Sequence, residues 1–228
     1  MKVQSVSQPL LLILLTSQTQ TFSNPQDYPP ETLPDENGWY QLFNGQNLDG
    51  WTPSENKNAC KVHNGKLILH GRRSHLFYTG PIQSASFKDF ELEAILMTTP
   101  GANSGIYFHT RYQDRGWPSR GYEAQINNSH ADFKKTGSLY AIRDINKSPV
   151  RDNQWFTYHI KVIDRTIEIK INGQTITKYT EPRNLNRPHR QLDEGTIALQ
   201  SHDSNNKVLY KSVKIRPLTP AIIATSSR

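Results

Sequence analysis

The feature that most constrains the fold is a series of short segments in which apolar and polar residues alternate, separated by turn residues. In Tyr158–Val162 and Ile167–Ile171 every second residue is apolar, the pattern of a strand with one buried face. The two segments meet at Asp164-Arg165, and the second is followed by Asn172-Gly173. Asn-Gly favours a tight hairpin because both residues tolerate positive φ. The sequence therefore predicts antiparallel strands here.

The same pattern recurs along most of the chain, and no helical period of useful length interrupts it. Further predicted strands are Gly65–His70, Phe87–Met97, Gly105–Arg111, Tyr122–Asn127, Thr175–Tyr179, Ile197–His202 and Lys207–Ile215, the last with a bulge before Val213. Many short strands with regularly spaced turns favour an all-β sandwich of two antiparallel sheets over a parallel α/β fold.

The first 23 residues have the zones of a secretory signal peptide. Lys2 precedes the apolar run Pro9–Leu15, and Thr, Ser and Gln follow. This run is too short to span a bilayer, so we expect a secreted or periplasmic protein without a stable membrane span. The predicted organisation is a signal peptide (1–23), a linker (24–37), one β-sandwich domain (38–217) and a tail (218–228). Since Cys60 is the sole cysteine, packing alone must hold the domain together.

The chain has a formal charge of +7 and a sequence pI near 9.4, which raises the question of a nucleic-acid partner. Its basic residues are scattered, however. The short clusters Arg72-Arg73, Lys134-Lys135 and Arg183–Arg190 lack the interleaved aromatic residues of a single-strand-binding groove. We therefore expect a solvated basic surface and no nucleic-acid partner.

Unusual polar residues gather on one side of three predicted strands. In Gly105–Arg111 the alternation sends Ile106 and Phe108 to the core. If this strand shares a sheet with Tyr122–Asn127 and Ile197–His202, one open face carries a carboxylate, two imidazoles, a guanidinium, amides and a phenol. Those residues are Tyr107, His109, Arg111, Glu123, Gln125, Asn127, Gln200 and His202.

Several short motifs together resemble a known family. They are Leu42–Gly45, Leu48–Trp51, Asn103–Ile106, Gly121–Gln125, Thr136–Tyr140, Trp155, Asn172-Gly173 and Gly195–His202. In number and order they are similar to the 3-keto-disaccharide hydrolase family, over about Gly38 to Arg216. The resemblance implies a concanavalin A-like jelly-roll sandwich, bacterial export and a role in handling glycosides oxidised at C3.

The predicted open face suits such a substrate better than an ordinary sugar. Retaining and inverting glycosidases need two suitably spaced carboxyl groups, whereas Glu123 is the only acid on its strand's open face and Gln125 and Asn127 occupy the next positions. A ketone at C3 acidifies the hydrogen at C2, so loss of the C1 oxygen becomes a β-elimination. One base and an oxyanion stabiliser are then sufficient.

We therefore hypothesise that Glu123 or His109 removes the C2 proton and that Arg111, with Tyr140, stabilises the enolate. Water addition to the resulting glycal completes net hydrolysis. The predicted substrate-binding residues, among which Gln200 and His202 hold the sugar or aid the leaving group, are Asn103, Tyr107, Gln125, Asn127, Tyr140, Gln200 and His202.

Each assignment has an alternative. Asn103 opens a segment that also suits a tight turn, and Glu123 and Arg111 could form a structural cross-strand ion pair. Trp117 is either a platform for a sugar ring or a lid on the sandwich edge. The whole face could equally belong to a noncatalytic carbohydrate-binding module.

A divalent cation is a further possibility, but no cofactor is assigned. His109, Glu123 and His202 could converge on one ion, and Asp144 or Asp152 could hold calcium in a loop. No pair of these residues has the close local spacing that makes a zinc site readable from sequence.

Overall fold

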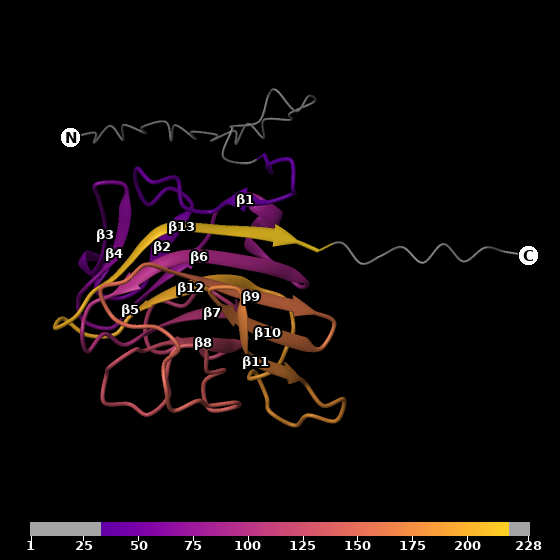
Figure 1. Ribbon diagram of the computed structural model, residues 1–228. Helices are drawn as coiled ribbons and strands as arrows, with labels where there is room; N and C mark the ends of the chain where they lie inside the picture. The colour runs from indigo at the N-terminus through magenta and orange to yellow at the C-terminus, as the bar shows by residue number, and fades with distance from the viewer. Residues whose placement is uncertain (1–32, 219–228) are drawn as a thin grey trace, which may run out of the picture.

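Two antiparallel sheets packed face to face form the protein, in a computed structural model that describes residues 33–218 (Figure 1). The predicted all-β sandwich is confirmed. The signal segment, most of the linker and nearly all of the tail lie outside the described residues. Between residues 33 and 218, no helix is long and apolar enough to cross a bilayer.

The larger sheet has eight strands and the smaller has five. The larger runs β11 (Gln174–Thr180), β10 (Thr166–Ile171), β9 (Phe156–Ile163), β6 (Phe90–Thr98), β13 (Val208–Pro217), β4 (Lys66–Leu69) and β3 (Cys60–His63), with β1 (Tyr40–Gln41) paired to β13. The smaller runs β2 (Trp51–Pro53), β5 (Ser74–Tyr78), β12 (Thr196–Ser201), β7 (Ser104–Thr110) and β8 (Tyr122–Ile126). Two 3₁₀ turns, η3 (Lys57–Ala59) and η4 (Ile82–Ala85), complete the elements of the described part of the chain.

Local sequence explains the hairpins of the larger sheet. Asn172 and Gly173 have φ values of 49° and 80°, as a two-residue turn between twisted strands requires. Asp164 also has positive φ, at the turn between β9 and β10. In β13 the pairing with β6 shifts between Tyr210 and Ser212, which confirms the predicted bulge.

The core lies between the sheets and is filled by the alternate residues of the facing strands. In β9 the buried positions are Phe156, Tyr158, Ile160 and Val162, while the residues between them are partly exposed. This period of two is what a sheet with one solvated face produces. The sequence pattern and the packing therefore agree for the larger sheet.

The smaller sheet is covered on both faces. Every residue of β7, β8 and β12 is buried, although polar residues alternate along these strands. The three strands are neighbours, in the order β12-β7-β8, as the sequence hypothesis requires. Their outer polar face therefore lies beneath loops rather than in open solvent.

Candidate functional site

A pocket of about 250 Å³ opens on the face of the smaller sheet that is turned away from the larger sheet. It combines strand residues with residues of three long loops, and its walls are Asn103, Tyr107, Trp117, Pro118, Glu123, Gln125, Asp132, Tyr140, Arg190, Gln200 and His202. Pockets for drug-sized ligands measure about 300–1,000 Å³. This one is therefore suited to enclosing a small group such as one sugar ring.

Glu123, on β8, lies at the floor of the pocket with 5% of its surface exposed. The Tyr107 hydroxyl donates to its Oε2 at 2.8 Å, and Gln200 Nε2 donates to its Oε1 at 3.3 Å. Gly105 on β7 leaves the room that this carboxyl group occupies, because a Cβ there would lie 2.8 Å from Glu123 Cγ. Three neighbouring strands thus fix one carboxyl group.

Burial dominates the electrostatics of Glu123 and raises its pKa from the ordinary carboxyl range to about 7. The hydrogen bond from Tyr107, the charge of Arg190 and the Gln200 bond oppose this rise, whereas the charge of Asp132 adds to it. Burial also raises the pKa of Tyr107, and the Glu123 charge reinforces the effect. Glu123 can therefore change protonation state near neutral pH while Tyr107 stays a donor.

Amide groups next to Glu123 retain unused hydrogen-bonding capacity. Gln125 Nε2 donates to Asn103 Oδ1 at 3.0 Å, and Asn103 Nδ2 lies 3.4 Å from His130 Nδ1. Within the described residues, Oε1 of Gln125 and Oε1 of Gln200 are buried and have no partner. Buried acceptors in native proteins are normally paired, so these two suit the hydroxyl groups of a ligand.

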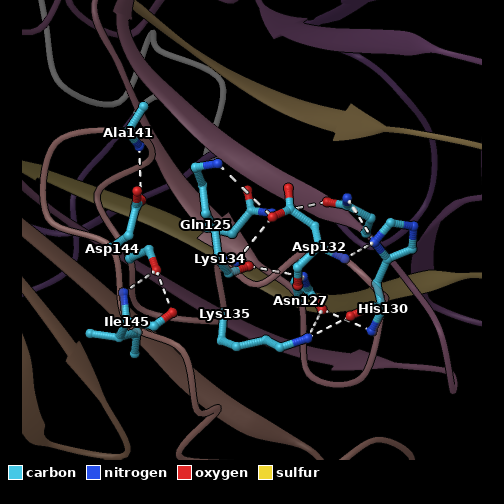
Figure 2. A network of polar contacts seen from close by, with 11 residues as sticks. Gln125, Asn127, His130, Asp132, Lys134, Lys135, Ala141, Asp144 and Ile145 are labelled. Carbon is cyan, nitrogen blue, oxygen red and sulfur yellow. Dashed lines mark hydrogen bonds and ion pairs between the residues drawn. The ribbon is translucent and has the colours of Figure 1, made fainter.

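Asn127, which the sequence hypothesis gave to substrate binding, is not among the residues that line the pocket. Its Nδ2 donates to the carbonyl groups of Asp132 and Lys134, and its Oδ1 accepts from the His130 N–H. Figure 2 shows this side chain inside the loop that follows β8. Asn127 thus shapes the loop that carries Asp132 to the pocket wall, as an Asx residue at a strand end commonly does.

Simple alternation also places the His109 side chain on the polar face of the sheet, whereas the structure does not. Thr196 pairs with Thr110 and Ala198 with Tyr107, so one residue of β12 lies opposite two of β7 and β7 has a bulge. His109, in this bulge, has φ of 54°. Its ring packs against Phe90 and Phe108. Because a bulge re-aims the side chains beyond it, His109 turns into the core and away from the pocket.

Both His109 nitrogens have partners in the protein. Nε2 donates to the Lys88 carbonyl at 2.8 Å, and Nδ1 accepts from the Asp193 N–H at 3.2 Å. Arg111, just past the bulge, lies outside the pocket as well, 3.8 Å from Asp193 and with its side chain 60% exposed. Of the two bases considered from the sequence, only Glu123 therefore lines the pocket. Among residues 33–218, Arg111 pairs with Asp193 and not with Glu123.

The rim of the pocket carries Trp117 and His202. The indole of Trp117 lies 5.5 Å from the His202 ring and 5.2 Å from the Arg73 guanidinium, measured between centres. His202 Nδ1 lies 3.2 Å from the Asp203 carboxylate, which orients the ring. The His202 and Tyr140 positions predicted from sequence both line the pocket.

Sequence reasoning missed two charged residues of the pocket, Asp132 and Arg190. Both lie in loops, where no periodicity indicates which way a side chain points, and Arg190 belongs to a basic segment that was interpreted as solvated surface. Their distance in sequence from Glu123 left no local pattern that could have found them.

No group of three or more His, Cys, Asp or Glu residues between 33 and 218 has the geometry of a metal site. The loop carboxylates considered for calcium make protein contacts. Asp144 accepts from the Ala141 N–H, and Asp152 accepts from the hydroxyls of Thr98 and Ser129.

Residues 38–216 match the sequence profile of the 3-keto-alpha-glucoside-1,2-lyase-like domain. The chain belongs to this family. The match covers the β-sandwich and every residue of the pocket. It confirms the resemblance seen in the motifs from Leu42 to His202, over nearly the same boundaries.

Solved structures with the same fold include carbohydrate-related proteins. A candidate glycosyl hydrolase from Parabacteroides distasonis ATCC 8503 superposes with a TM-score of 0.69 at 21% identity, over 83% of this chain and 99% of that chain. A second from the same strain gives 0.61 at 21%, over 79% and 99%. The carbohydrate-binding module CBM66 from Bacillus subtilis gives 0.51 at 14%, over 72% and 94%.

No curated protein matches the sequence. At these identities the solved structures establish the shared fold. Family and fold together identify a glycosyl hydrolase-like or carbohydrate-binding domain.

Proposed function

We propose that this protein cleaves glycosides that carry a ketone at C3, with Glu123 as the base that removes the C2 proton. The observation that carries the proposal is a buried carboxyl group in a sugar-sized pocket with its pKa raised to about 7. A general base is most effective when its pKa lies near the working pH. Family membership supports the same chemistry.

The reaction begins when the Glu123 carboxylate takes the hydrogen from C2. The electron pair of that bond forms a C2=C3 double bond, and the C3 oxygen becomes an enolate. When the enolate reforms the ketone, a C1=C2 double bond forms and the bond from C1 to the aglycone oxygen breaks. Water then adds across C1=C2, with oxygen at C1 and the proton returned to C2, so the net reaction is hydrolysis.

Charge at the C3 oxygen needs a stabilising partner, and Arg190 takes the role that the sequence hypothesis gave to Arg111. Arg190 lines the pocket, and its positive charge lowers the pKa of both Glu123 and Tyr107. A cation that acts on those two groups also acts on an enolate beside them. Tyr140, in the same wall, adds a hydroxyl donor.

The leaving aglycone oxygen needs a proton, and His202 is placed to give it. Its Nδ1 faces Asp203, so Nε2 is the nitrogen available to the pocket. Asn103 and the free Oε1 of Gln125 hold hydroxyl groups of the sugar.

Ordinary glycoside hydrolysis is a second candidate, because Asp132 brings another carboxyl group to the pocket. Two carboxyl groups in one pocket, of which Glu123 has a raised pKa, are the type of pair that inverting and retaining enzymes use. This route acts on the unoxidised sugar, so the substrate distinguishes it from the elimination route.

We further propose that the protein is exported and acts after a sugar oxidoreductase has produced the C3 ketone. The segment 1–23 supports export by its charged, apolar and polar zones. The elimination needs no redox cofactor, because oxidation precedes it. A divalent cation could polarise the C3 oxygen, and chelation tests that role.

The test is release of aglycone from a chromogenic 3-keto-glucoside and from the matching unoxidised glucoside, with and without EDTA. We expect turnover of the keto compound alone and its loss in Glu123→Gln. Glu93→Gln, which changes a carboxyl group on the larger sheet paired with Lys214, is the matched control and keeps full activity.

Turnover of the unoxidised glucoside would instead support the two-carboxylate route. Sugar binding without turnover of either compound would overturn the enzymatic proposal in favour of a noncatalytic carbohydrate-binding module. Loss of turnover on adding EDTA, restored by a divalent cation, would add a metal to the site.

A further inference from the structure

A second histidine of the smaller sheet, His75 on β5, is buried without any hydrogen-bond partner. Its exposed fraction is 0%, and neither Nδ1 nor Nε2 has a partner within residues 33–218. The ring lies among Phe77, Tyr107 and Trp117, with centroid distances of 6.3, 5.3 and 5.5 Å. Burial lowers the pKa of His75 to about 4, so at neutral pH the ring is uncharged and offers one N–H donor and one acceptor.

A purely structural role explains this residue poorly. His109, two strands away in the same sheet, is buried with both nitrogens bonded. At position 75 the contacts are aromatic, and Phe77 already serves that purpose on the same face of β5. A buried imidazole with unused donors and acceptors destabilises a fold relative to an apolar ring of similar size.

Gln200, directly across from His75 in the pairing of β5 with β12, has the complementary unused group. Its Nε2 serves Glu123 and Tyr107, while its Oε1 is buried and unpartnered. Residues opposite each other in antiparallel strands have Cβ atoms about 5 Å apart. An N–H donor and a carbonyl acceptor therefore project from opposed positions on the same face of the sheet, where one hydroxyl group can bind to both.

The Trp117 ring packs against the His75 ring, edge to face. Its contacts are with the rings of His75 and His202 and with the Arg73 guanidinium. By contrast, the indole of Trp51 donates to the Leu42 carbonyl at 2.6 Å and is buried, whereas Trp117 is 45% exposed.

The backbone of the Trp117 loop is anchored independently of the ring. Gln113 bonds the carbonyl groups of Arg115 and Trp117 and accepts from the Ser119 N–H, and Glu55 accepts from the Gly116 N–H. Rotation of the Trp117 side chain alone can therefore expose His75 to the pocket while the loop stays in place.

We propose that His75 and Gln200 form a hydroxyl-binding subsite gated by the Trp117 ring, and that a sugar hydroxyl accepts from the His75 N–H and donates to Gln200 Oε1. The inference rests on the proposed function, because it concerns recognition of the same sugar. Gln200 links the subsite to the proposed base, because its Nε2 contacts Glu123. The C2 atom of the sugar must lie beside that carboxyl group. The subsite therefore receives a hydroxyl from the opposite side of the ring, at C4 or C6.

The experiment is a cycle between the His75→Phe variant and substrates that lack one hydroxyl. We compare kcat/KM of wild-type protein and the variant for a chromogenic 3-keto-glucoside and for its 4-deoxy and 6-deoxy analogues. In the wild type we expect one analogue to lose about tenfold to a hundredfold, since a group left unpaired in a polar subsite is strongly rejected. In His75→Phe the same analogue should match the parent.

The subsite is refuted if both analogues lose the same factor in the variant as in the wild type, or if neither loses activity in the wild type. Failure of the proposed function is a separate result, since it shows as no turnover of the parent 3-keto-glucoside by wild-type protein. In that case the same cycle is run on dissociation constants for the parent and deoxy sugars, with the same criteria.

Stability gives a readout that a structural histidine would not share. We expect His75→Phe to keep or raise the melting temperature, because it removes unsatisfied buried nitrogens. A large loss of folded protein in this variant would argue for a structural role and against the subsite.

The gate is tested without changing His75, by acylation of the imidazole with diethylpyrocarbonate read by mass spectrometry. His75 should resist modification in the wild type, react in Trp117→Ala, and be protected again by saturating sugar. Resistance in Trp117→Ala, or reaction there that sugar does not prevent, would overturn the gated subsite.

Discussion

Gly105→Ala tests most directly whether the position of the Glu123 carboxyl group determines the activity. The backbone at Gly105 is ordinary strand, so alanine fits there without φ strain, and glycine is not required for a turn. The added Cβ would lie 2.8 Å from Glu123 Cγ, 3.0 Å from Cδ and closer still to Oε1. Carbon contacts prefer about 3.5–4.0 Å, so the carboxyl group must move by roughly 1 Å.

The size of the expected effect follows from that displacement. A shift of about 1 Å at a reacting group costs on the order of 100-fold in rate, and here it also disturbs the bonds from Tyr107 and Gln200. We therefore expect kcat on a 3-keto-glucoside to fall about 100-fold, with KM changed much less. The free energy of unfolding in urea should change by no more than about 1 kcal/mol, because alanine suits a strand better than glycine.

A double-mutant cycle shows whether the effect acts through Glu123. In a Glu123→Gln background, Gly105→Ala should produce no further loss of the residual rate. A fully active Gly105→Ala variant would refute the reasoning. An equal fall in both backgrounds, or an activity loss that parallels loss of folded protein, would also refute it.

Four further outcomes are expected. The kcat/KM of the keto substrate should rise as pH increases through about 7, since Glu123 acts ionised. In Tyr107→Phe this rise should move to higher pH, because the Tyr107 hydrogen bond lowers the Glu123 pKa and its removal lets that pKa increase. The stability that protonated Glu123 provides is fully present below pH about 4.5 and is lost as the pH rises to about 7. The free energy of unfolding of Glu123→Gln should therefore exceed that of the wild type by about 3 kcal/mol at pH 8 and by little at pH 4. Arg190→Gln should lower kcat and raise the apparent pKa of Glu123, because the Arg190 charge lowers that pKa in the wild type. Both changes are measured from a pH–rate profile. Arg111→Ala should stay within about twofold of wild type in steady-state turnover, because its exposed side chain lies outside the pocket.

The sandwich could be predicted because its determinants are local. Alternation in Tyr158–Val162 and Ile167–Ile171 and the Asn172-Gly173 turn specify strands and a hairpin within a few residues, and the structure has both. The adjacency of β7, β8 and β12 was a condition of the sequence hypothesis, and the structure places the three strands side by side.

The parts of the site that sequence could not give depend on nonlocal geometry. A single bulge in β7 reverses the side to which His109 points, and one extra residue in a strand leaves no mark in an alternating pattern. Asp132 and Arg190 reach the pocket through long loops whose course is set by contacts such as those of Asn127. The pKa of Glu123 likewise depends on burial, which those loops complete.

Hydrogen-bond satisfaction separates the structural polar residues of the smaller sheet from those available to a ligand. Both ring nitrogens of His109 and both side-chain polar atoms of Asn127 have hydrogen-bond partners, and both residues lie outside the pocket. Gln125, Gln200 and His75 are as deeply buried but keep atoms without a partner among residues 33–218. Since an unpaired buried group lowers stability by about 1–3 kcal/mol, its retention needs a compensating gain, and binding a polar ligand supplies one. The unsatisfied atoms of these three residues belong to the pocket wall beside Glu123 and to the ring packed against Trp117. The same face of the sheet thus carries both the proposed base and the proposed hydroxyl subsite.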